Sequence, residues 1–370
     1  MNPKVSEKTD DNGALKFKLS GVDKSIANAI RRIILSDIPS VVFRTFPHSE
    51  NRVNIIKNNT RFTNEMLKQR IGCVPINLPV DIPIEDYEVH VDVKNNTNEI
   101  TYVTTKDFKI KNKTLDKFLS DAENRKVFQP SEITGDYIII ARLRPGYEKV
   151  QGESLKFIAT LDIGTAKEDG MYSVASTSCY SNTIAPDKVS AAWAEEEARL
   201  ESEMQTKDFI ENYRENWRVS NAERYFLDNS FDFNIETVGV YDNDALVETA
   251  CDVMLDKIAK FNNQLQMKTV KISSSETTIE NCYDVVLEGE DYTLGKVLEF
   301  ILYNNYYQDK FLTYCGFKKF HPHDDDSIIR IAFTNNEEMT TIFDTLIAVC
   351  GTARKVFEDI RGHFATESED

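Results

Sequence analysis

Residues 21–34 read GVDKSIANAIRRII and residues 289–302 read GEDYTLGKVLEFIL, so one motif occurs twice at an offset of 268 residues. The copies align without a gap: the Gly, the Asp and one Ile are identical, and six further positions match in kind. Each copy follows a short run of alternating apolar residues, 17–19 and 285–287, which is typical of a half-buried strand. The sequence therefore predicts two related α+β units, whose equivalent apolar stripes are expected to pack as a pseudo-symmetric pair.

Each half of the chain is also expected to end in a helix with an apolar seam, at about 244–262 and about 338–363. Apolar residues recur there at alternating steps of four and three residues, the second seam starting at Met339. Two such seams can bury against each other as a short coiled-coil-like pair. The alternative is that each seam packs on its own sheet. The residues expected to pack inside the pair are Ile26, Ile30, Ile33, Leu298, Ile301, Leu302, Met254, Ile258, Leu346 and Phe357.

The segment between the repeats changes character twice. From about 48 to 180 the pattern is one of short strands, at 89–93, 100–104, 137–143, 155–161 and 172–176, punctuated by prolines. Residues 187–226 differ from this pattern, and 191–204 are rich in Ala and Glu, which predicts a solvent-facing helical insertion. A further strand is expected over 231–238. The middle of the chain is therefore predicted to be a β-rich unit followed by helices.

Charge and cysteine usage exclude several classes of protein. The 370 residues carry a formal net charge of −17, although residues 1–80 hold 13 basic and 7 acidic residues. A basic first segment on an acidic body permits a free-standing nucleic-acid-binding module as the alternative function. No apolar run of about 18 residues predicts a membrane span, and the polar N-terminus has no secretory segment. The six separated cysteines argue against a disulfide scaffold and for reduced thiols inside a cell.

Signals for enzyme chemistry are weak. The sequence has no Gly-x-Ser-x-Gly elbow and no Gly-rich phosphate loop. His321 and His323, followed by the acidic residues 324–326, are the one plausible metal cluster, and a solvated loop is the favoured interpretation of that segment. The other histidines are isolated and are interpreted as structural. We therefore expect no catalytic residues, no metal and no cofactor.

Residues 23–39, DKSIANAIRRIILSDIP, resemble the helix that opens the alpha-like assembly subunit of cellular RNA polymerases. The resemblance extends to QRIGCVPI at 69–76, to 153–174 and to 231–239. The tail resembles the smaller partner subunit, called L in archaea, through EDYTLG at 290–295, CGF at 315–317, HPH at 321–323 and IRI at 329–331. These stretches cover essentially the whole chain in family order.

The resemblance implies a fusion of the alpha-like subunit with its small partner, as in the RNA polymerases of large DNA viruses. The implied domains are an alpha-like dimerisation domain at 1–47 and 180–263, interrupted by a β-rich insert domain at 48–179, and a small-partner dimerisation domain at 264–370. The implied role is a non-catalytic platform that binds the largest and second-largest subunits and small zinc-binding subunits. DNA would be contacted only through the complex, and the expected locations are the virion and the infected-cell cytoplasm.

The same resemblance indicates which residues face other subunits. Arg31 and Arg32 lie off the apolar stripe, where arginine is suited to docking on the second-largest subunit. Two departures from the family pattern stand out. Only two cysteines lie between 48 and 180, too few for the four-cysteine cluster that related subunits often carry, and Tyr292 replaces a usual His. The residues expected at subunit interfaces are Asn28, Arg31, Arg32, Arg70, Glu290, Asp291, Thr293 and Leu294.

Overall fold

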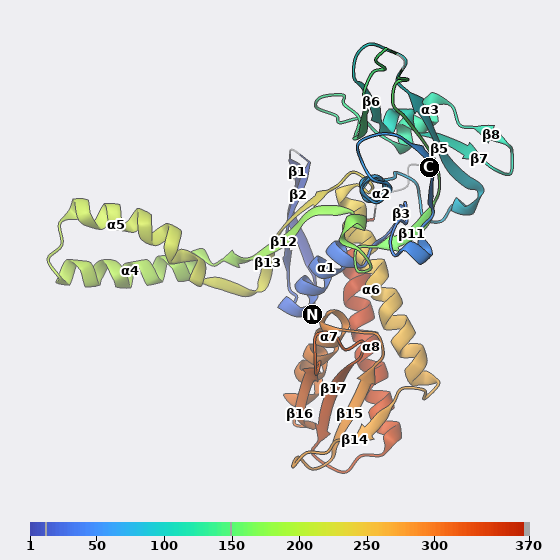
Figure 1. The fold of residues 1–370 in the computed structure, drawn as a ribbon. Coiled ribbons are helices and arrows are strands. Elements are labelled where there is room, and N and C mark those ends of the chain that lie inside the picture. Colours follow the sequence, from blue (N-terminus) through green and yellow to red (C-terminus); the bar gives the residue numbers. More distant parts are fainter. Residues whose placement is uncertain (12, 149, 366–370) are drawn as a thin grey trace. The chain divides into compact units, whose positions relative to one another are not determined.

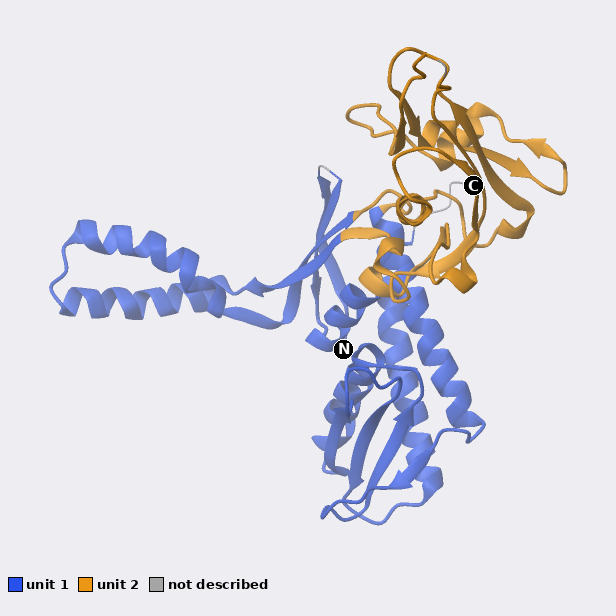
Figure 2. Ribbon diagram, in the orientation of Figure 1, with its two compact units in different colours: residues 1–33, 177–236, 243–370 blue, residues 34–176, 237–242 orange. Residues whose placement is uncertain are grey.

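The computed structural model describes residues 1–11, 13–148 and 150–365 (Figure 1). The chain divides into two compact units (Figure 2). Unit 1 comprises residues 1–33, 177–236 and 243–370, and unit 2 comprises residues 34–176 and 237–242. The last five residues of the expected domain 264–370 lie outside the described residues. Helices and sheets occur in both units, which confirms the mixed α+β class.

The first sheet of unit 1 has the strand order β1-β2-β13-β12, with β1 at Lys4–Asp11, β2 at Ala14–Ser20, β13 at Phe226–Thr237 and β12 at Ala175–Ile184. Strand β13 pairs antiparallel with β2, and the rings of Phe17 and Phe233 stack with their centroids 4.9 Å apart. Sequence reasoning missed β1, because its nearly all-polar residues form an exposed edge strand without apolar alternation.

The two copies of the repeated motif form two helices of unit 1. Helix α1 spans Lys24–Ser36, its last three residues belonging to unit 2, and helix α7 spans Tyr292–Leu302. Asp23 accepts a hydrogen bond from the Ser25 amide, and Asp291 accepts one from the Thr293 amide, so both copies begin on the same aspartate cap. A π-helical turn, Tyr303–Tyr307, extends α7.

The second sheet of unit 1 has the order β14-β15-β17-β16, with β14 at Ile272–Ser274, β15 at Cys282–Leu287, β17 at Ser327–Phe333 and β16 at Leu312–Lys318. The long helices α6 (Asn243–Gln266) and α8 (Met339–Arg361) pack against each other (Figure 1). All residues of the two seams are buried except Met339, which is 44% exposed. That residue was expected in the seam, but it is the first residue of α8 and is exposed at the start of the helix.

A helical hairpin connects β12 to β13. Helix α4 spans Pro186–Ser202 and helix α5 spans Lys207–Ser220. The hairpin was expected to face solvent, but it has an apolar core of its own, in which Trp193 and Trp217 pack edge to face with ring centroids 5.3 Å apart. Leu200 and Ile210 complete this core from the two helices. Both tryptophans of the chain therefore lie in one small substructure.

Unit 2 is built around a five-stranded sheet of order β4-β10-β5-β7-β8. The strands are β4 (Val53–Asn58), β10 (Ser154–Thr160), β5 (Tyr87–Lys94), β7 (Lys109–Asn112) and β8 (Lys117–Phe118). Two smaller sheets pair β6 (Thr101–Thr104) with β9 (Ile139–Leu143) and β3 (Pro39–Val42) with β11 (Asp162–Thr165). Helices α2 (Asn64–Gly72) and α3 (Asp121–Val127) complete the unit, which has a core of its own.

The strand predicted at 172–176 is wrong. Residues 170–172 form a 3₁₀ turn, in which the Asp169 side chain accepts a hydrogen bond from the Met171 amide, and β12 begins at Ala175. The aspartate cap and Gly170 favour a turn over an extended chain there. Within the described ranges, no helix combines the length and apolar character that crossing a membrane requires.

Candidate dimerisation interface

An acidic pair, Glu290 and Asp291, stands at the head of α7. Oδ1 of Asp291 accepts a hydrogen bond of 2.9 Å from the Thr293 amide, and Oδ2 accepts one of 2.8 Å from Nη2 of Arg32 on α1. One carboxylate thus caps the helix of the second repeat and binds an arginine of the first. A cap that is also an ion-pair partner fixes α7 with respect to α1 more tightly than either contact alone.

Arg32 makes a second contact with the same helix. Its Nε donates a 3.0 Å hydrogen bond to Oγ1 of Thr293, so the guanidinium reaches two acceptors on the first turn of α7. The Arg32 and Asp291 side chains are 32% and 25% exposed, and Thr293 is buried. The ion pair is therefore partly shielded from water, which makes it stronger than a fully exposed surface pair.

Lys257 on α6 forms an ion pair with Glu290, the other member of the acidic pair. Its Nζ lies 3.2 Å from Oε2 of Glu290, and the two side chains are only 17% and 13% exposed. The Glu290 carbonyl also accepts a 2.7 Å hydrogen bond from the Ser327 hydroxyl, which ties the acidic pair to β17. Sequence reasoning missed Lys257, because the only indication in the sequence is that a lysine lies beside the apolar seam of α6. We call Arg32, Lys257, Glu290, Asp291 and Thr293 the polar clasp.

Contacts beyond the polar clasp join the same parts of unit 1. Nη1 of Arg361 on α8 lies 2.7 Å from Oδ1 of Asp252 on α6, and this hydrogen bond raises the pKa of Arg361. Both side chains are close to half exposed, so this pair contributes little to stability. After α8, Phe364 is buried and packs edge to face on Phe17 of β2, with ring centroids 4.9 Å apart. The apolar contact is the stronger of the two.

The ten residues expected to pack inside the pair are all buried, with exposures of at most 1%. They lie on α1, α7, α6 and α8 of unit 1. Leu294, which was expected at a subunit interface, is also fully buried in the first turn of α7.

Arg31 and Asn28 form a separate contact on α1. Nε and Nη2 of Arg31 donate to Oδ1 of Asn28 at 3.0 and 2.9 Å, so the arginine side chain is held against its own helix. The Arg31 carbonyl accepts a hydrogen bond of 3.4 Å from the Ser178 hydroxyl on β12. Within the described residues, Arg31 has no hydrogen bond to α7 and does not belong to the polar clasp.

Arg70 belongs to unit 2, whereas the polar clasp belongs to unit 1. Its Nε and Nη2 donate to the carbonyls of Ile140 and Ile139 at 2.8 and 2.6 Å. Its guanidinium lies over the Phe62 ring, 5.4 Å from the centroid. Arg70 therefore ties α2 to strand β9.

The histidine segment forms a turn. The His321 amide donates to Oδ2 of Asp324 at 2.8 Å, and the His323 amide lies 3.2 Å from Nδ1 of His321. In the part of the chain that the structure describes, no three His, Cys, Asp or Glu side chains gather as a metal site would require. The six cysteines are free thiols, and burial raises the pKa of Cys315 to about 12.

Two copies of one motif form α1 and α7, and the long helices α6 and α8 pack against each other in the same unit. The family model of the RNA polymerase Rpb3/Rpb11 dimerisation domain matches residues 16–258, more than half of the chain. The chain therefore belongs to the RNA polymerase Rpb3/Rpb11 dimerisation domain family. The match ends within α6, before the second copy of the motif.

Curated relatives agree with this family. The chain is 26% identical to DNA-directed RNA polymerase subunit Rpo3 of Methanosphaera stadtmanae over 181 residues, 49% of this chain and 60% of that protein. It is 32% identical to Rpo3 of Pyrococcus furiosus over 104 residues, 26% of this chain and 36% of that protein. It is 26% identical to human DNA-directed RNA polymerases I and III subunit RPAC1 over 306 residues, 69% of this chain and 82% of that protein. The matches thus span between about a third and four fifths of these relatives.

Proposed function

We propose that this chain is a non-catalytic assembly-platform subunit of a DNA-directed RNA polymerase, in which two alpha-like units pair in cis. Family membership and the similarity to Rpo3 and RPAC1 support a polymerase subunit. The proposed partners are the largest and second-largest subunits and small zinc-binding subunits. The fused arrangement further suggests a viral polymerase, acting in the infected-cell cytoplasm and carried in virions.

The observation that carries the cis pairing is the polar clasp. Arg32 and Asp291 are 259 residues apart in sequence, yet they share a 2.8 Å hydrogen bond between the two copies of the motif. Lys257 of α6 binds the neighbouring Glu290, so two helices of the first part converge on one dipeptide of the second. Buried apolar faces on all four helices accompany these contacts. An interface that combines these polar contacts with buried apolar faces suits a pair that never needs to separate.

Docking of the second-largest subunit is proposed at the Arg31 face of α1. Arg31 is half-buried, and its two side-chain hydrogen bonds use Nε and Nη2, which leaves Nη1 available among the described residues. Asn28 holds the guanidinium in place and so lowers the entropy that docking would cost. A carboxylate or a backbone carbonyl on the partner would suit this group. Arg32 is already used in cis by the polar clasp.

Gentle purification of the tagged chain from its native source tests the proposal. We expect two large chains with the sequence features of the catalytic subunits to co-purify, together with templated RNA synthesis. The Arg31→Ala variant should lose the second-largest subunit while it keeps its own fold by circular dichroism. Recovery of the chain without other polymerase subunits would overturn the proposal, and salt-dependent DNA binding by the isolated chain would favour the nucleic-acid-binding alternative.

A further inference from the structure

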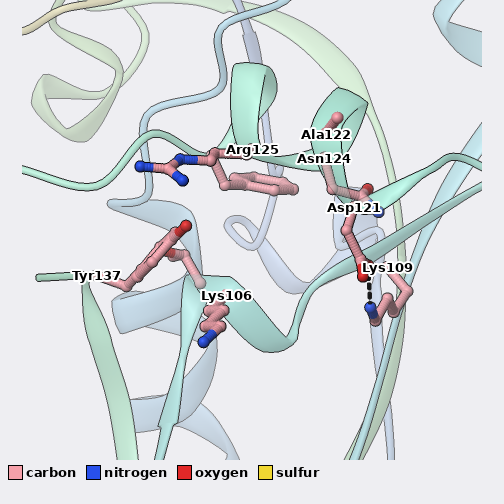
Figure 3. A pocket seen from close by; sticks show the side chains of 9 residues that line it. Lys106, Lys109, Asp121, Ala122, Asn124, Arg125 and Tyr137 are labelled. Carbon is pink, nitrogen blue, oxygen red and sulfur yellow. Dashed lines mark hydrogen bonds and ion pairs between the residues drawn. The ribbon is translucent and has the colours of Figure 1, made fainter. Parts of the chain in front are cut away.

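Unit 2 has a hollow of about 380 Å³ that neither the family nor the proposed function explains (Figure 3). This volume lies within the range of roughly 300–1,000 Å³ that is usual for small-molecule sites. Most of its wall comes from helix α3 and from the turn that begins at Thr105. Tyr137, in the segment before β9, completes the wall. These residues lie within 34–176, so the hollow belongs to unit 2 alone.

The wall of the hollow is positively charged although the chain as a whole is acidic. Lys106, Lys109 and Arg125 line it against a single acid, Asp121, whereas the chain carries a net charge of −17. Lys109 is paired with Asp121 at 2.6 Å, and this hydrogen bond lowers the pKa of that carboxyl, so the two charges offset each other. Within the described ranges, Lys106 and Arg125 have no ion pair or hydrogen bond from their side chains. In Figure 3, Arg125, Tyr137 and Lys106 surround one side of the hollow and the Lys109–Asp121 pair closes the other.

The wall of the hollow also has an apolar part. Phe128, which packs into the core of unit 2, supplies it. Thr105 lines the hollow as well, but it is 2% exposed and its hydroxyl is buried without a hydrogen-bond partner among the described residues, so a ligand in the hollow would not reach that hydroxyl.

We propose that this hollow is a binding site for the phosphate groups of a small molecule, such as the polyphosphate of a nucleotide. Lys106 and Arg125 supply the positive charge, Arg125 as a fork suited to phosphate oxygens and Lys106 as a point charge. Tyr137 supplies a hydroxyl donor. The net charge of the lining, three bases against one acid, matches a di- or triphosphate better than a single carboxylate.

Isothermal titration of the full-length chain with inorganic pyrophosphate at low ionic strength tests the proposal. Adenosine triphosphate is the larger probe, and adenosine is the probe without phosphate. We expect saturable binding of the two phosphate probes with one molecule per chain, and none of adenosine. Binding of adenosine alone, or of no probe, would overturn the assignment of a phosphate site.

Two variants and a matched control locate the site. Replacing Lys106 and Arg125 by Ala together should weaken pyrophosphate binding by roughly tenfold or more, because two charged contacts are lost. Lys126→Ala removes the next charge on the same helix, which does not line the hollow, and should bind as the unchanged chain does. Equal losses in both variants would show a general charge effect and refute this location.

Discussion

Replacing Arg32 with Ala removes both hydrogen bonds that α1 makes to the head of α7 in the polar clasp. Nη2 loses Asp291 at 2.8 Å and Nε loses Thr293 at 3.0 Å. Asp291 keeps the Thr293 amide as its capping partner, so α7 itself should remain a helix. The expected loss is therefore in the attachment of α7 to α1 and not in either helix.

The size of this loss of free energy depends on how far water reaches the side chains of Arg32 and Asp291. A hydrogen bond to a charged group contributes roughly 1.5–3 kcal/mol, and partial screening by water reduces this to about 1 kcal/mol for each bond here. The side chains of Arg32 and Asp291 are 32% and 25% exposed, so we expect the two bonds together to contribute about 2 kcal/mol. That free energy corresponds to an association about 30-fold weaker.

Association of two fragments, 1–270 and 271–370, measures this loss directly, because the cut falls between α6 and β14. Arg31→Ala is the matched control, since the side chain of Arg31 binds Asn28 on its own helix. Asp291→Asn keeps the capping oxygen and, combined with Arg32→Ala, completes a double-mutant cycle. A dissociation constant of Arg32→Ala within twofold of the unchanged pair, or an equal loss in Arg31→Ala, would refute the reasoning.

Three further predictions concern other contacts. Gly295→Ala should destabilise unit 1 by about 1–3 kcal/mol in urea, because a Cβ there would lie 2.0 Å from the Phe317 ring; a midpoint like that of the unchanged chain would contradict this. The hydrogen bond from Arg330 lowers the pKa of Asp284. The ion pair therefore stabilises the folded chain fully above the ordinary pKa of 3.8, and this stabilisation is lost as the pH falls through the lowered pKa. The melting-temperature deficit of Asp284→Asn at pH 7 should therefore vanish in acid, and a deficit that persists would exclude the ion pair as its cause. Leu200→Ala should loosen the helical hairpin, and tryptophan fluorescence should report it while the rest of the chain stays folded, since both tryptophans lie there.

Periodicity predicted those parts of the fold in which apolar burial dominates. Helices α1, α6, α7 and α8 lie where the repeats and seams predicted them, because each buries one apolar stripe. Strand β1 could not be predicted, since its residues are polar and its place depends on pairing with β2 along an edge. The apolar core of the helical hairpin was masked by the surrounding glutamates, although Trp193 and Trp217 were visible as large apolar residues in a charged segment.

The polar clasp shows where sequence reasoning reaches its limit. Glu290, Asp291 and Arg32 could be singled out by the family resemblance, but their pairing depends on how two distant helices meet. Lys257 was missed because a lysine next to an apolar seam resembles an ordinary solvated charge until its partner is known. The roles of Arg31 and Arg70 at other subunits stay predictions, and the contacts of Arg70 with β9 add a structural role that its sequence context did not reveal.

The two hydrogen bonds of Arg32 in the polar clasp run from the first copy of the motif to the second. At the position equivalent to Arg32 the second copy has Phe300, which cannot donate, and the buried hydroxyl of Ser25, the equivalent of Thr293, has no partner among the described residues. The first copy thus supplies the arginine and the second copy supplies its two acceptors in the polar clasp, so the two copies are complementary and not interchangeable. A single polypeptide holds the correct partner at roughly millimolar effective concentration. In the proposed cis pairing, the covalent link therefore enforces the one combination of copies in which Arg32 meets its acceptors.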